Sequence, residues 1–118
     1  MKKVLIVDDA AFIRKTLRLI LEKYGFEVVG EAENGIAAMM KIQSLDPDIV
    51  TLDITMPDMD GIDCLKQMKK LEKMPDVVMI TALGRQQKVI EGVHSGAKGF
   101  IVKPFKEDIV VNTLKSLV

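Results

Sequence analysis

Residues 3–9 read KVLIVDD, a run of four apolar residues, Val4 to Val7, that stops at two aspartates. The run is rich in Val and Ile and has no polar position, which is typical of a strand buried on both faces of a parallel sheet. An amphipathic helical pattern follows it and ends at Gly25. The start of the chain therefore predicts a strand followed by a helix that packs back on it.

The same alternation continues along the chain, with further apolar runs at 28–32, 49–52, 77–80 and 100–102. Gly30 and Glu31 interrupt the second run and the fifth is short, so both are expected at the sheet edges. The pattern predicts an α/β fold, a single doubly wound (βα)5 flavodoxin-like domain. Its five-stranded parallel sheet is expected to have the order 2-1-3-4-5.

Polar, glycine and apolar positions also predict where some helices begin or end and which of their residues face the core. Asn34 and Asp60 are expected N-caps of the second and third helices, and Gly96 should end the fourth. The apolar spacing predicts these core-facing residues for the second and fourth helices: Ile36, Met39, Met40 and Leu45, then Val89, Ile90 and Val93.

Size and composition narrow the class of protein. A chain of 118 residues with 48% hydrophobic and 29% charged residues is expected to form one domain over 1–118, with no output domain. Basic and acidic residues balance at 17 each, so no nucleic-acid partner is expected. No apolar run is long enough to span a membrane, and no signal peptide precedes the first strand. The single Cys64 fits a reducing, cytoplasmic location.

Reactive side chains come directly after four of the predicted strands: Asp8 and Asp9, Asp53, Thr81, and Lys103. In doubly wound sheets this edge binds ligands, at the point between strands one and three. Two carboxylates about 4 Å apart repel by roughly 4 kcal/mol at an effective dielectric near 20, which a divalent cation relieves. Carboxylates suit Mg²⁺, so a magnesium site is expected.

A cation beside Asp53 favours phosphoryl transfer. A carboxylate can accept a phosphoryl group as an acyl phosphate. Magnesium and the Lys103 ammonium would neutralise the equatorial oxygens of the transferring group, and the Thr81 hydroxyl could donate to one of them. The residues alone thus predict a phospho-accepting protein.

The motifs DD at 8–9, DITMPDMDG at 53–61, TA at 81–82 and KPF at 103–105 resemble response-regulator receiver domains across the whole chain. The resemblance implies that Asp53 accepts a phosphoryl group from a histidine kinase. It implies Mg²⁺, for which Mn²⁺ can substitute, on Asp8, Asp9, Asp53 and the backbone carbonyl of Thr55. Thr81 and Lys103 would contact the phosphoryl group. The Lys103–Pro104 peptide is cis in many relatives.

The residues AAFIR at 10–14 further resemble chemotaxis receivers of the CheY type. This implies a monomeric stand-alone regulator whose target is a protein such as a flagellar switch component, with a phosphatase as a further expected partner. On phosphorylation Thr81 would move and Phe100 would turn inward, changing the surface formed by helix four, strand five and helix five. Plain core packing of Phe100 is the alternative.

Other functions are compatible with parts of the pattern. A phosphorelay intermediate would use the same residues. A haloacid-dehalogenase-like phosphatase would need an acid where Thr55 stands, so the chain is expected not to be an enzyme beyond its own phosphorylation and slow dephosphorylation. A nucleotide or flavin binder would need a glycine-rich loop where Asp8 and Asp9 stand. A receiver that signals without phosphate would not need the intact acid set.

Overall fold

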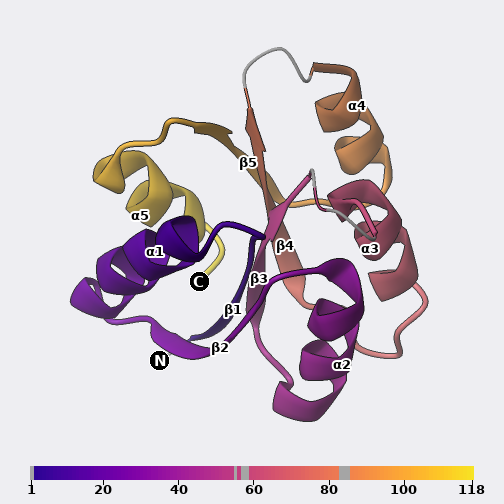
Figure 1. Cartoon of the computed structure of the whole chain (residues 1–118), viewed down its shortest axis with the longest axis horizontal. Coiled ribbons are helices and arrows are strands. Elements are labelled where there is room, and N and C mark those ends of the chain that lie inside the picture. Colours follow the sequence, from indigo (N-terminus) through magenta and orange to yellow (C-terminus); the bar gives the residue numbers. More distant parts are fainter. Residues whose placement is uncertain (1, 55, 57–58, 83–85) are drawn as a thin grey trace.

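The computed structural model describes residues 2–54, 56, 59–82 and 86–118, and these form an alternating series of strands and helices (Figure 1). Along the chain the elements are β1 (Lys3–Val7), α1 (Ala11–Lys23), β2 (Glu27–Ala32), α2 (Gly35–Leu45), β3 (Ile49–Asp53), α3 (Gly61–Met68), β4 (Asp76–Ala82), α4 (Gln86–His94), β5 (Gly99–Lys103) and α5 (Glu107–Lys115).

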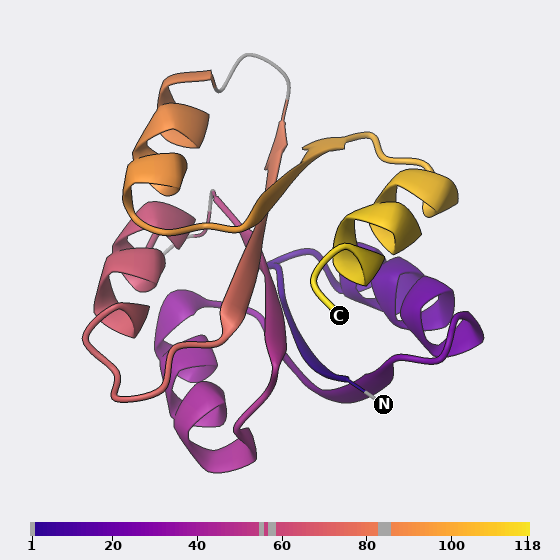
Figure 2. The same cartoon turned by 180° about the vertical axis from the view of Figure 1, so that it is seen from behind.

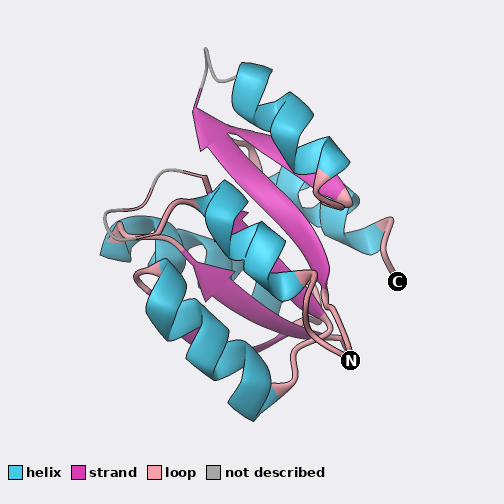
Figure 3. Cartoon of the chain, turned by 90° about the vertical axis from the view of Figure 1, so that its right-hand side faces the viewer, coloured by secondary structure: helices cyan, strands magenta, loops and turns pink. Residues whose placement is uncertain are grey.

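The strands form one parallel sheet in the order β2-β1-β3-β4-β5, which confirms the predicted fold and order. Helices α1 and α5 cover one face, and α2, α3 and α4 cover the other (Figures 1 and 2). The view from the side shows the strands enclosed between the two helical layers (Figure 3). Because all strands run the same way, their carboxyl ends meet at one edge of the sheet.

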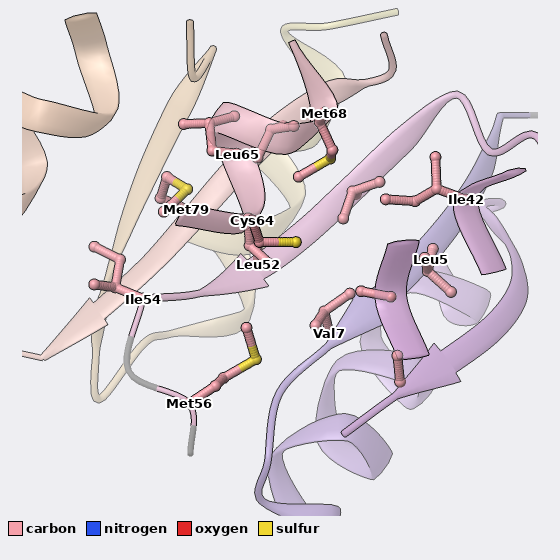
Figure 4. Close-up of a cluster of buried hydrophobic side chains, with 14 of the residues drawn as sticks. Leu5, Val7, Ile42, Leu52, Ile54, Met56, Cys64, Leu65, Met68 and Met79 are labelled. Atoms are coloured by element: carbon pink, nitrogen blue, oxygen red, sulfur yellow. The ribbon is translucent and has the colours of Figure 1, made fainter. Parts of the chain in front are cut away.

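Alternation along the inner strands divides the core into two clusters. In β1, Val4 and Ile6 pack with α1 and α5, whereas Leu5 and Val7 pack with α2 and α3. The second cluster surrounds Leu52 of β3 and contains several methionines (Figure 4). Burial on both faces explains why the inner strands are apolar at nearly every position.

The predicted helix boundaries are confirmed. The side chain of Asn34 accepts a hydrogen bond from the backbone N–H of Ala37, and Asp60 accepts one from Asp63. Gly25 and Gly96 have φ angles of +89° and +98°, which favour glycine after a helix.

The predicted core-facing side of α2 is partly wrong. Ile36 and Met40 are 55% and 68% exposed, and Met39 and Leu45 lie only at the margin of the core. The buried side instead carries Gly35, Ala38 and Ile42. A Cβ on Gly35 would lie 2.7 Å from Met59, so the helix approaches its neighbours through its smallest residues. Hydropathy alone cannot distinguish that side from an equally apolar outer side.

The prediction for α4 is also partly wrong, since only Val89 of the three predicted core-facing residues is partly buried. Ile90 and Val93 are more than half exposed, while Gly92 is buried beside the Phe100 ring of β5. A Cβ on Gly92 would lie 3.0 Å from two ring carbons, so the helix is held by a close approach rather than by its large apolar residues.

Within the described residues, no helix has the length and apolar character needed to cross a bilayer.

Thr51 offers a test of the core. It is fully buried in the middle of β3, and its hydroxyl has no hydrogen-bond partner among the described residues. We expect Thr51→Val to raise the free energy of unfolding by about 1 kcal/mol in urea titrations, because the buried hydroxyl is desolvated without compensation. Thr113→Val is the matched control, since that hydroxyl donates to the Ile109 carbonyl at 2.7 Å. A loss of stability in Thr51→Val would contradict the prediction.

Candidate functional site

The acidic residues predicted from the strand ends do come together. Asp8 follows β1 and Asp53 ends β3, and these two strands are neighbours with Val7 opposite Leu52. Asp9 extends from the same loop as Asp8. One carboxylate oxygen from each of the three residues lies within 4.8 Å of the others. The carboxyl edge between β1 and β3 therefore holds a compact cluster of acids.

Both carboxylate oxygens of Asp8 accept hydrogen bonds. Asp8 is fully buried, and its Oδ1 accepts a hydrogen bond from the backbone N–H of Ala10 at 2.9 Å. Its Oδ2 accepts one from the Lys103 ammonium at 2.9 Å. A buried carboxylate needs such donors, because burial without them is costly.

Lys103 links the two buried acids. Lys103 is the last residue of β5, an outermost strand of the sheet. Its ammonium lies 2.9 Å from Asp8 Oδ2 and 3.6 Å from Asp53 Oδ1. Asp53 is 6% exposed, so both pairs lie in a poorly solvated place where charges interact strongly. Among the described residues, one ammonium faces three carboxylates, which leaves this part of the site with an excess of negative charge.

Asp9 differs from the other two acids. Its side chain is exposed and makes no hydrogen bond or ion pair to the described residues. The site therefore has a closed side, formed by Asp8 and Asp53, and an open side at Asp9 where solvent and ligands can enter.

The three carboxylates fit a magnesium ion. Two oxygens on one Mg²⁺ lie at most about 4.2 Å apart, twice the metal–oxygen distance of about 2.1 Å. The spacing of up to 4.8 Å needs only a small closure of the side chains. The carbonyl of Thr55, the remaining predicted ligand, lies outside the described residues.

Thr81 lies at the same edge but within β4 rather than after it. Its side chain is buried, and its hydroxyl donates to the carbonyl of Ala82 at 3.2 Å. That distance is longer than the usual range for an O–H···O hydrogen bond, so a stronger acceptor could replace the carbonyl. The Lys103–Pro104 peptide that follows β5 is cis.

Phe100 is half-buried, with its ring against Gly92 of α4 and the core cluster beneath it. In this structure the ring packs under α4, an arrangement compatible with both the core-packing and the switch interpretations. Its role as a switch remains a prediction.

Gly61 has a role at the site that the sequence motif alone does not explain. Its N–H donates to the carbonyl of Ile54, and a Cβ there would lie 2.3 Å from the Asp53 carbonyl oxygen. Only glycine lets the start of α3 come this close to the end of β3.

Arg14 and Glu31 are neighbours of the site that sequence reasoning did not identify. The Arg14 Nη1 donates to the backbone carbonyl of Asp8 at 2.7 Å, and its Nε donates to Glu31 at 3.1 Å. Burial raises the pKa of Glu31, but the hydrogen bonds and charges of Arg18 and Arg14 outweigh it and keep that pKa below its usual value. Glu31 lies near the acids because β2 pairs with β1, and the spacing of these residues along the sequence does not indicate that proximity.

A hollow of about 500 Å³ lies at the opposite edge of the sheet, beside Lys2, Tyr24 and Phe26. None of the residues of the acid cluster lines it, so the volume of a hollow would not locate the acid cluster.

The charge balance of the cluster predicts that removing its cation and removing one of its acids change the free energy of unfolding in opposite directions. Lys103→Met leaves the buried Asp8 carboxylate uncompensated and should lower the free energy of unfolding in magnesium-free buffer. We expect a loss of about 2 kcal/mol, less than for a fully buried pair because Lys103 is partly exposed. Asp53→Asn removes one of three like charges and should raise stability by about 1 kcal/mol. Urea unfolding with a chelator present measures both.

Lys106→Met is the control, because it removes the same charge from an exposed position outside the cluster. A similar loss in that variant would assign the effect to net charge. Lower stability in Asp53→Asn would contradict strong repulsion among the acids.

Comparison with known proteins gives a consistent result. The response regulator receiver domain family matches residues 4–115. The chemotaxis protein CheY of Bacillus subtilis is 51% identical over 95% of this chain and 93% of its own length. The chemotaxis protein CheY of Thermotoga maritima is also 51% identical, over 98% of this chain and 97% of its own length.

Solved structures agree with the sequence relatives. The CheX–CheY–BeF3–Mg²⁺ complex of Borrelia burgdorferi contains a chain that superposes with a TM-score of 0.92 at 43% identity, covering 98% of this chain and 88% of that one. The response regulator domain of Thermotoga maritima CheB superposes with a TM-score of 0.88 at 33% identity, covering 99% and 93%. The fold, the motifs and these matches together establish that this chain belongs to the response regulator receiver domain family and is similar to its chemotaxis members.

Proposed function

We propose that this protein is a stand-alone chemotaxis response regulator that accepts a phosphoryl group on Asp53 from the phosphohistidine of a histidine kinase, in a reaction that requires Mg²⁺. One observation carries the proposal: the Asp53 carboxylate lies 3.6 Å from the Lys103 ammonium and within 4.8 Å of two further acids. A nucleophile, a cation and metal-binding oxygens thus meet at one point.

The transfer itself is a simple displacement. A carboxylate oxygen of Asp53 forms a bond to phosphorus as the phosphorus–nitrogen bond of the donor breaks. The leaving imidazole keeps the electron pair and takes a proton from solvent. Bound Mg²⁺ would neutralise charge on the transferring oxygens.

The protein's own groups stabilise the product. The Lys103 ammonium, which pairs with Asp8 and Asp53 in this structure, can donate to a phosphoryl oxygen at the same place. The Thr81 hydroxyl can exchange its long bond to Ala82 for a phosphoryl oxygen. Charge-assisted hydrogen bonds of this kind are stronger than neutral ones, which favours the exchange.

A solved relative supports the metal and the phosphoryl chemistry. The Borrelia burgdorferi CheY of the CheX complex is described with BeF3 and Mg²⁺, and its chain is 43% identical to this one. BeF3 can occupy the place of a phosphoryl group. We therefore expect Asp8, Asp9 and Asp53 to bind Mg²⁺ here, with the Thr55 carbonyl as a further ligand.

The exposed apolar residues supply an output surface. Ile90 and Val93 on α4, Val102 on β5 and Ile109 on α5 are all more than two-fifths exposed. Phe100 and Thr81, on adjacent strands, lie between this surface and Asp53. We propose that phosphorylation changes this surface and so the binding of a target such as a flagellar switch component.

The function class can be tested by intact-mass spectrometry. We expect acetyl phosphate with Mg²⁺ to add one phosphoryl group to the wild type and none to Asp53→Asn, because the acceptor is the Asp53 carboxylate. Chelation of the metal should abolish the addition. Labelling of Asp53→Asn would exclude Asp53 as the acceptor, and steady turnover of a phosphomonoester would favour the phosphatase alternative.

Metal binding can be tested separately from phosphorylation. At a Mg²⁺ concentration ten times the Kd, bound metal should stabilise the wild type by about 1.4 kcal/mol. Asp9→Ala should lose most of this gain in thermal melts, since its carboxylate is the open side of the site. Equal stabilisation of both proteins would remove Asp9 from the metal site.

A further inference from the structure

We propose that Arg14 is a positioning residue that directs Asp9 toward the metal by holding the backbone carbonyl of Asp8. The inference rests on the proposed function, because it concerns the magnesium site. It assigns a role to a residue outside the acid cluster, located in the first helical turn after it.

The contact is short and well supported. Arg14 Nη1 donates to the Asp8 carbonyl at 2.7 Å, and the Arg14 side chain is only 16% exposed. The carbonyl of Asp8 and the N–H of Asp9 belong to one planar peptide group. Fixing the direction of that carbonyl therefore fixes the direction in which the backbone of Asp9 leaves the loop.

Asp9 depends on this contact more than Asp8 does. Asp8 is already held by its backbone N–H, which donates to Ala32 at 3.0 Å, and by both carboxylate oxygens. The Asp9 side chain has no hydrogen bond or ion pair to the described residues. Arg14 is thus the contact that orients the peptide on which the exposed metal ligand is carried.

A second layer of contacts fixes Arg14 itself. Its Nε donates to Glu31 Oε1 at 3.1 Å, and Arg18 Nε donates to the other oxygen, Oε2, at 2.7 Å. Glu31 lies on the edge strand β2, so the Arg14–Glu31 pair connects the loop of Asp8 and Asp9 to that strand. A lysine at position 14 could donate to the carbonyl or to Glu31 but has no fork that serves both in fixed directions.

If Arg14 acted only through its charge, its removal would change the Mg²⁺ affinity in the opposite direction from its removal as a positioning residue. A cation near the site repels Mg²⁺, so an arginine that acted only through its charge would weaken metal binding, and its removal would tighten it. An arginine that acts by positioning strengthens metal binding, and its removal weakens it. Contacts that orient metal ligands commonly change metal affinity by roughly 10-fold to 100-fold.

Magnesium titration of the full chain without a phosphodonor tests the inference, by calorimetry or by the shift in Tm. We expect Arg14→Ala to raise the half-saturating Mg²⁺ concentration about tenfold. Arg18→Ala is the matched control, because it removes the same charge from the same carboxylate without touching Asp8, and it should stay within twofold of the wild type. Arg14→Lys should recover part of the loss and also guards against misfolding of the alanine variant.

A double variant separates positioning from general damage. If Arg14 acts through Asp9, Arg14→Ala should have little further effect on Mg²⁺ affinity when Asp9 is already alanine. An equal loss in the Asp9→Ala background, a tighter affinity in Arg14→Ala, or the same affinity in Arg14→Ala and Arg18→Ala would overturn the inference. Wild type that neither binds Mg²⁺ nor takes a phosphoryl group would instead overturn the proposed function.

Discussion

The ion pair between the buried Asp8 and the partly buried Lys103 is the contact on which the rest of the site depends. It joins the carboxyl ends of β1 and β5 across the sheet and holds an ammonium beside Asp53. Removing both charges from water is costly unless each group makes further hydrogen bonds. At Asp8 the backbone N–H of Ala10 supplies one of them. Because the ammonium balances only part of the acid charge of the described cluster, its carboxylates have the excess of negative charge that suits a divalent cation.

The strand register and the helix packing connect the acid cluster to helix α4 through direct contacts. Thr81 and Lys103 lie on β4 and β5, where Ala82 is opposite Lys103 and Met79 is opposite Phe100. The Phe100 ring lies against Gly92, so strand β5 and helix α4 meet in a close contact. The apolar residues that α4 leaves exposed therefore belong to a helix that packs directly on the strand of Lys103.

Much of the fold could be predicted because it follows from local patterns. Apolar runs separated by helical patterns require strands buried on both sides, and the polar second run and short fifth run identify the edges. The faces of α2 and α4 could not be predicted in the same way. Their inner sides carry Gly35, Ala38 and Gly92, whose value lies in small size rather than hydropathy, and that depends on what they pack against.

For this protein the sequence by itself determined the parallel α/β architecture and the residues at the carboxyl edge, because strand polarity places every strand end on the same side. Only the tertiary structure decided that one ammonium lies between Asp8 and Asp53, and that Arg14 holds the loop of the acids against Glu31. These contacts join residues from different strands and helices. Their distances depend on how the helices and sheet pack, which no local pattern contains.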